Sequence, residues 1–287
     1  MLMDSRHVTV ADGVDLAVYD WGGVGGLPFL LVHGLASNAR MWDGVARRLV
    51  AAGHRAVAVD LRGHGRSSKP DTGYDMADVA DEIQTLCDRL GLDRPVVAGQ
   101  SWGGNLVIEL AARHPEVIRG IVPVDGGFFH LADRFPDWDD CAREMAPPKL
   151  VGTPRGRIEA AIRSVNRHWP PEAVDGVLAN FEIRTDDTIA PWLTFERHML
   201  VLRGLWEHHP RHRYGEIETP VLWMPAHDGT TTRTSKHTSI DEAQQLLSRS
   251  RVEWFSPGHH DLHAEQPDRV VKILVDAVAD GFFGDLT

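Results

Sequence analysis

The sequence predicts an α/β fold with a mostly parallel, doubly wound sheet, and three observations agree on this class. Short apolar runs typical of buried strands alternate with longer segments of helical spacing along most of the chain. Polar, glycine-rich loops follow several of these runs. The alternation stops between residues 126 and 214 and then resumes. We therefore expect one core domain, made of residues 1–125 and 215–287, that is interrupted by a helical lid at 126–214.

The first half of the chain contains the strand–helix repeats that define this class. The run at 29–32 is continuously apolar, which suits a strand covered on both faces, and it ends at His33-Gly34. A helix at 76–92 is predicted because Val79, Ile83, Leu86 and Leu90 share one face. The other expected elements are a hairpin from 6–10 and 15–21, a helix at 45–53, and strands at 55–60, 96–98 and 120–125.

The second half begins with the segment 126–214, which is rich in Trp, Pro and Arg and has helix-like pieces. We interpret it as a lid over the carboxyl ends of the strands, where open parallel sheets bind their ligands. The sheet pattern then resumes with strands at 219–224 and 251–255 and helices at 240–249 and from Pro267 onward.

Composition and charge limit the classes of function. The chain has 287 residues, of which 43% are hydrophobic and 25% charged, as in ordinary globular proteins. Its formal net charge of −11 argues against binding nucleic acid or an anionic membrane, so we expect a small-molecule substrate. The sequence has no apolar run of membrane-span length and no signal-peptide pattern, which predicts a cytoplasmic protein. Cys87 and Cys141 are expected as free thiols.

Ser101 occupies the most informative position in the sequence. It lies where a buried strand passes into a helix, and Gly99 and Gly103 complete a G-x-S-x-G pattern around it. A sharp, strained turn of this kind exposes a serine hydroxyl, and the flanking glycines let neighbouring backbone pass closely. The alternative is a glycine-rich turn with an incidental serine. The rest of the chain must distinguish these two interpretations.

A nucleophilic serine needs a base within hydrogen-bond reach and a carboxylate that orients this base. The loop after the last predicted strand holds three histidines, His259, His260 and His263. Two aspartates, Asp125 and Asp228, follow other predicted strands. These residues are therefore the candidates for the base and the acid.

In their order along the chain, His33-Gly34, the serine turn, the aspartates and the histidine segment resemble the α/β-hydrolase family. The catalytic histidine of that family follows the last strand in a segment similar to G-H-x-x-H-x-E-x-P. His260 lies seven residues before Pro267, which matches the spacing of that segment, whereas His259 matches only its glycine–histidine pair. The resemblance therefore favours His260 as the base.

The resemblance leaves two positions for the acid. Asp228 is near the place where many family members carry it, although the run from Pro220 is one residue shorter than usual. Asp125 lies 24 residues after Ser101, at the position used by some haloalkane dehalogenases and by the zearalenone-type lactonases. We favour Asp125 and keep Asp228 as the alternative.

In the family, two backbone N–H groups form the oxyanion hole. By resemblance they belong here to Leu35, after His33-Gly34, and to Trp102, after the serine. No cofactor and no metal are expected. Gly63–Ser67 lacks the Lys-Ser/Thr of a phosphate loop, and neither the trio of histidines after the last strand nor His208, His209 and His212 has a ligand set at recognised spacing.

The sequence thus predicts a serine hydrolase that cleaves a small hydrophobic carboxylic ester or lactone through an acyl-enzyme. Alternatives with the same triad are a carbon–carbon bond hydrolase, a thioesterase or an aminopeptidase. A further alternative is a non-catalytic receptor that uses the fold to bind a small ligand.

Overall fold

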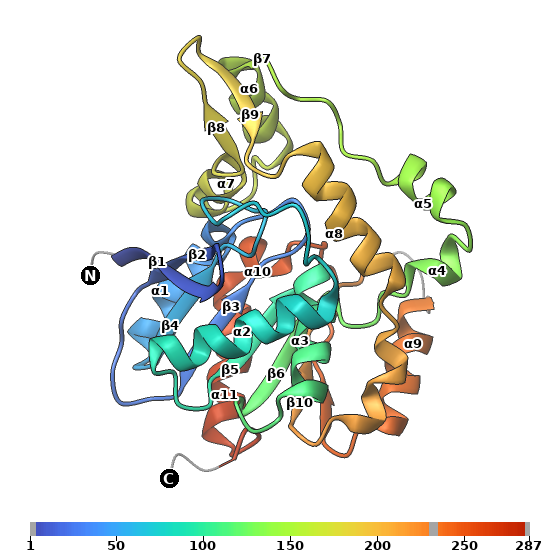
Figure 1. Cartoon of the computed structure of the whole chain (residues 1–287). Helices are drawn as coiled ribbons and strands as arrows, with labels where there is room; N and C mark the ends of the chain where they lie inside the picture. The colour runs from blue at the N-terminus through green and yellow to red at the C-terminus, as the bar shows by residue number, and fades with distance from the viewer. Residues whose placement is uncertain (1–3, 230–234, 285–287) are drawn as a thin grey trace.

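The computed structural model describes residues 4–229 and 235–284, and an eight-stranded sheet forms its centre (Figure 1). β1 and β2 pair antiparallel, as do β2 and β4, whereas all the other neighbours are parallel. This confirms the predicted fold class. In spatial order the strands are β1 (Asp4–Ala11), β2 (Val14–Asp20), β4 (Arg55–Val59), β3 (Pro28–Val32), β5 (Val96–Gln100), β6 (Gly120–Val124), β10 (Val221–Trp223) and β11 (Ser250–Val252).

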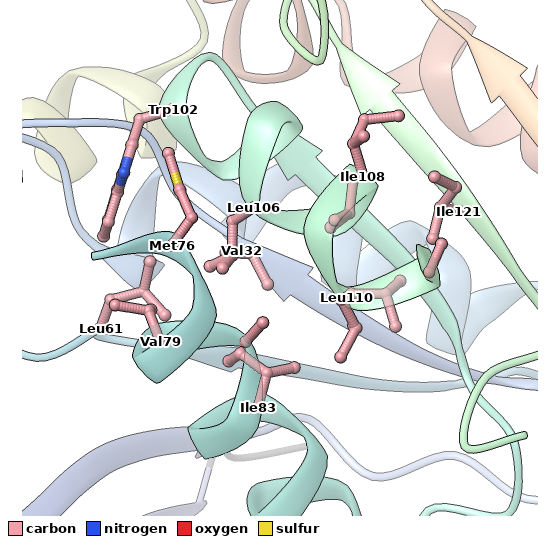
Figure 2. Close-up of a cluster of buried hydrophobic side chains, with 14 of the residues drawn as sticks. Val32, Leu61, Met76, Val79, Ile83, Trp102, Leu106, Ile108, Leu110 and Ile121 are labelled. Atoms are coloured by element: carbon pink, nitrogen blue, oxygen red, sulfur yellow. The ribbon is translucent and has the colours of Figure 1, made fainter. Parts of the chain in front are cut away.

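Helices cover both faces of the sheet, so alternate residues of the central strands enter two separate cores. In β3, Leu30 and Val32 pack with the cluster under α2 (Met76–Leu90) and α3 (Trp102–Arg113). Figure 2 shows part of this cluster. Phe29 and Leu31 face the opposite cluster, under α1 (Asp43–Ala51) and α11 (Pro267–Ala279). The continuous apolar run at 29–32 therefore has the two-sided burial that the sequence predicts.

The ends of helix α2 follow from its sequence. The Asp75 carboxylate caps the first turn by accepting a hydrogen bond from the Asp78 N–H at 2.9 Å. Gly91 ends the helix with a φ of 59°, a left-handed conformation in which a residue without Cβ is least strained. The four apolar residues expected on one face of this helix are buried.

The chain leaves the sheet between β6 and β10, and α6 with its neighbouring strands projects beyond the sheet (Figure 1). The sequence predicts only helices here, but the structure also has a small antiparallel sheet. Its strands are two to four residues long, too short to show a hydrophobic period. The elements are α4 (Leu131–Arg134), α5 (Trp138–Glu144), β7 (Thr153–Pro154), α6 (Arg155–Val165), α7 (Pro171–Leu178), β8 (Phe181–Ile183), β9 (Thr188–Pro191), α8 (Phe195–Glu207), η2 (Pro210–His212) and η3 (Tyr214–Glu216).

Three further elements differ from the sequence prediction. Helix α9 (Ser235–Leu246) already includes the five residues before the expected start at Ile240, and η1 (Ala39–Trp42) and α10 (Leu262–Glu265) are short helices that the sequence does not predict. Cys87 and Cys141 are buried free thiols. Within residues 4–229 and 235–284, no helix has the length and apolar character needed to cross a membrane. The division of the chain into a core and a lid stays a prediction.

Candidate functional site

Ser101 sits in a strained corner between β5 and α3. Its backbone has φ 55° and ψ −117°, a region that residues with a Cβ rarely adopt. Close backbone contacts surround this corner: a Cβ on Gly99 would lie 2.1 Å from the Gly103 carbonyl oxygen, and one on Gly103 would lie 2.6 Å from the carbonyl oxygen of His33. The G-x-S-x-G glycines are therefore required by space alone.

Two other loops lie in close contact with Ser101. A Cβ on Gly34 would lie 3.0 Å from the Ser101 Cβ, and a Cβ on Gly126 would lie 2.2 Å from the Ser101 carbonyl oxygen. Leu35 directly follows Gly34, and Trp102 directly follows Ser101. The two residues expected to supply the oxyanion N–H groups thus belong to the two backbone segments that meet here. Their role stays a prediction.

His33 supports the first of these loops from inside the core. Its side chain is fully buried, Nε2 accepts a hydrogen bond from the Leu61 N–H at 3.0 Å, and Nδ1 lies 2.7 Å from the Gly34 carbonyl oxygen. Burial lowers the pKa of His33, which keeps the ring neutral and able to accept. The His-Gly pair is therefore a structural brace for the loop that carries Leu35.

Asp125 and His260 come together although they lie far apart in the sequence. Asp125 directly follows β6 and has a φ of 40°, and its Oδ2 accepts a hydrogen bond from His260 Nδ1 at 2.7 Å. The carboxylate is almost fully buried, whereas the His260 side chain is 49% exposed. An imidazole held in this way presents its other nitrogen, Nε2, away from the acid.

The two side chains stabilise each other's charged forms. Burial raises the pKa of Asp125, but the hydrogen bond from His260 and the charge of Lys236 oppose it, and the net pKa is below the usual value. Burial lowers the pKa of His260, but the hydrogen bond and the charge of Asp125 outweigh it, and the net pKa is above the usual value. His260 is therefore a stronger base than a free imidazole.

The histidine loop is attached next to Ser101. The Gln100 side chain donates a hydrogen bond from Nε2 to the His260 carbonyl oxygen at 3.1 Å, and Gln100 is the residue before Ser101. The Phe129 ring meets the His260 ring edge-on at 6.1 Å. Among the described residues, no hydrogen bond joins the Ser101 hydroxyl to His260 in this structure, so that contact stays a prediction.

The other residues considered for these roles lie elsewhere. His259 faces Glu265, with Nδ1 3.0 Å from the carboxylate, and His263 is fully buried against Trp42. Asp228 is exposed in the loop after β10. Within the described part of the chain, no hydrogen bond joins Asp228 to the His260 ring.

Two residues at the site carry roles that the sequence interpretation missed. Asn105, on α3, accepts hydrogen bonds from the Gly127 and Phe129 N–H groups at 2.9 and 3.3 Å, and so fixes the loop after Asp125. A polar residue within the first two turns of the helix, which are otherwise apolar, was the signal available for it. Lys236 contacts the Asp125 carboxylate from α9, and no sequence pattern pointed to it.

Comparison with known proteins agrees with this architecture. Residues 28–172 match the family model described as alpha/beta hydrolase fold. A non-heme chloroperoxidase of Streptomyces lividans is 40% identical over 106 residues, which cover 37% of this chain and 38% of that protein. A bifunctional esterase/perhydrolase of Acinetobacter calcoaceticus is 37% identical over 109 residues, which cover 38% of this chain and 40% of that protein. The matches thus span less than half the length of these curated relatives.

The solved structure of E-2-(acetamidomethylene)succinate hydrolase superimposes on nearly the whole chain. The TM-score is 0.79 at 24% sequence identity, and the match covers 96% of this chain and 98% of that one. Such a likeness establishes the fold. With the family-model match over half of the chain, it leads to one conclusion: this protein belongs to the α/β-hydrolase family.

Proposed function

We propose that the chain is a serine hydrolase that cleaves a small hydrophobic carboxylic ester or lactone through an acyl-enzyme. The observation that carries this proposal is the hydrogen bond of 2.7 Å between His260 Nδ1 and the buried carboxylate of Asp125, beside a strained serine turn. An oriented base, a buried anion and an accessible hydroxyl are the parts that nucleophilic acyl transfer requires, and Ser101 is partly exposed.

In the proposed reaction the Ser101 Oγ attacks the carbonyl carbon while His260 Nε2 takes its proton. Asp125 holds the Nδ1–H of the ring and stabilises the imidazolium that forms. The N–H groups of Leu35 and Trp102 bind the oxyanion of the tetrahedral intermediate. His260 then gives the proton to the leaving alcohol, and a water molecule that His260 activates releases the acyl group.

The segment 126–214 is proposed as the lid that selects the substrate. It leaves the sheet directly after Asp125, and its first residues include Phe129, which contacts the His260 ring. An apolar ring next to the base favours a hydrophobic acyl or alkoxy group. The Asp125 position of the acid is our reason for including lactones beside open-chain esters.

A second candidate, perhydrolysis, is favoured by the relative named esterase/perhydrolase. Hydrogen peroxide would replace water as the nucleophile that releases the acyl group, and a peracid would leave instead of an acid. Adding peroxide to an ester assay and measuring the peracid separates the two reactions.

The first test is Ser101→Ala on a p-nitrophenyl ester. Loss of the nucleophile is expected to lower turnover about a thousandfold or more, while circular dichroism shows an unchanged fold. A variant with an undiminished rate would refute the mechanism. A panel of esters, lactones, thioesters, carbon–carbon substrates and aminoacyl amides then ranks the reactions open to this triad, and turnover of none of them would favour a receptor.

The second test compares Asp125→Asn with Asp228→Asn. We expect Asp125→Asn to lower kcat by roughly 1,000- to 10,000-fold, because the imidazole loses its orientation and the stabilisation of its charge. Asp228→Asn, at an exposed position, is expected to stay within about threefold of the wild-type rate. The reverse ranking would assign the acid to Asp228.

A further inference from the structure

We propose that Lys236 is a positioning residue of this site, which holds the Asp125 carboxylate against His260 and sets the pH range in which His260 works as a base. The inference rests on the proposed function, in which His260 is the base and Asp125 the acid.

The contacts of Lys236 join three segments of the chain. Its Nζ donates hydrogen bonds to Asp125 Oδ1, after β6, and to the Ala226 carbonyl oxygen, after β10, the latter at 2.7 Å. It also lies over the Phe128 ring, 5.7 Å from the centroid. The side chain is only 25% exposed, so Lys236 is held between the ends of two strands rather than extended into solvent.

The two oxygens of Asp125 have separate partners. Oδ2 faces His260, whereas Oδ1 accepts hydrogen bonds from the Ala226 N–H, at 2.9 Å, and from Lys236. A buried carboxylate needs a compensating charge, and a neutral imidazole supplies none. Lys236 therefore provides the permanent positive charge that keeps Asp125 anionic before His260 takes a proton.

The pairing of Lys236 supports a role outside its own helix. It lies on α9, but its Nζ contacts the Asp125 carboxylate, which follows β6 and is 111 residues away in the sequence. By contrast, Lys272 lies in the middle of α11, pairs with Asp276 one turn away and is 74% exposed. Lys236 is therefore paired with a buried carboxylate of another segment, whereas Lys272 is paired within its own helix.

The charged groups around His260 give the direction of the pH effect. Burial lowers the pKa of His260. The carboxylates of Asp125 and Asp261 raise this pKa, and the charge of Lys236 lowers it. The neighbouring His263, on α10, is buried, and burial lowers its pKa to about 3, so it carries no charge at neutral pH. Without the charge at 236, the pKa of His260 rises further. A larger share of the base is then protonated at a given pH, and the acid limb of the activity profile moves to higher pH.

The experiment measures kcat and KM against pH for Lys236→Met, Lys236→Arg and the control Lys272→Met on a p-nitrophenyl ester. In Lys236→Met we expect the acid limb of kcat/KM to move to higher pH, with activity on that limb about threefold lower than in the wild type. KM should change less than kcat, because Lys236 touches the acid and not the substrate. Lys236→Arg should restore the wild-type limb, and Lys272→Met should keep it.

An unchanged acid limb in folded Lys236→Met would overturn the inference. If Lys236→Met fails to fold, Lys236→Gln is measured in its place. If neither variant folds, Lys236 is needed for the fold alone, and this result also overturns the inference. Reaction of the wild type with a fluorophosphonate separates this result from failure of the proposed function. Modified Ser101 with an unchanged limb refutes only the role of Lys236, whereas unmodified Ser101 refutes the serine mechanism.

Discussion

Two helices of similar length, α3 and α6, show how differently the two parts of this molecule are constrained. In α3, which begins directly after Ser101, ten of the twelve residues are buried. In α6, which lies in the segment between β6 and β10, none of the eleven residues is buried. Close packing constrains the side chains next to the nucleophile, whereas it constrains those of α6 far less. The chemistry is therefore expected to depend on the first region and the choice of substrate on the second.

The largest effect that distinguishes these regions is expected from alanine in place of glycine. At Gly99 the added Cβ would lie 2.1 Å from a backbone carbonyl oxygen, so we expect Gly99→Ala to lose roughly 3 kcal/mol or more of unfolding free energy. At Gly156, in α6, no atom lies within 4 Å of the added Cβ, and Gly156→Ala should gain about 0.5–1 kcal/mol. Urea unfolding measures the free energy of unfolding of both variants. Equal changes in Gly99→Ala and Gly156→Ala would contradict the difference in packing between the two regions.

The next effect is expected from shortening apolar side chains. Leu106, on α3, is fully buried in the cluster of Figure 2, and Leu106→Ala should cost about 2–5 kcal/mol through lost burial and a cavity. Val165, at the end of α6, is 81% exposed, and Val165→Ala should stay within about 0.5 kcal/mol of the wild type. The midpoints of urea unfolding compare the two variants. A large loss in Val165→Ala would show that another surface covers α6 in solution.

The smallest of these effects depends on pH. His263 is fully buried, its two ring nitrogens have no hydrogen-bond partner within the described residues, and burial lowers its pKa from 6.5 to about 3. Below pH 6.5 the His263 ring is protonated in the unfolded chain but stays neutral in the native protein. The free energy of unfolding therefore decreases as the pH falls. His263→Phe should remove this loss, which amounts to about 2 kcal/mol at pH 5.

The control for this prediction is His168→Phe, at an exposed position just after α6. It should leave the pH dependence of the unfolding free energy as in the wild type. If His263→Phe loses as much stability as the wild type between pH 7.5 and pH 5, the ring at 263 is not held neutral.

The same contrast explains how much the sequence could predict. Continuous apolar runs such as 29–32 predict the buried strands, because burial on both faces leaves no polar position. The glycines around Ser101 predict the corner, because the backbone passes too closely for a Cβ. In the segment between β6 and β10 such constraints are weak. The short strands β7, β8 and β9 were missed there, since two to four residues show no period.

The contacts of the Asp125 carboxylate could not be predicted from the sequence. The sequence favours Asp125 over Asp228 without showing its partners, and it is the pairing of β6 with β10 that places the Ala226 N–H against Asp125. Lys236 reaches the same carboxylate from the part of α9 that precedes its apolar pattern. A contact between segments so far apart in the chain leaves no mark in composition or spacing.

The most direct measurement of the central claim is reaction with a fluorophosphonate, followed by peptide mapping of the adduct. If Ser101 is a nucleophile that His260 activates, the adduct will lie on Ser101, will be absent in Ser101→Ala, and will form far more slowly in His260→Ala. An adduct on another residue, or an equal rate of modification without His260, would contradict the account.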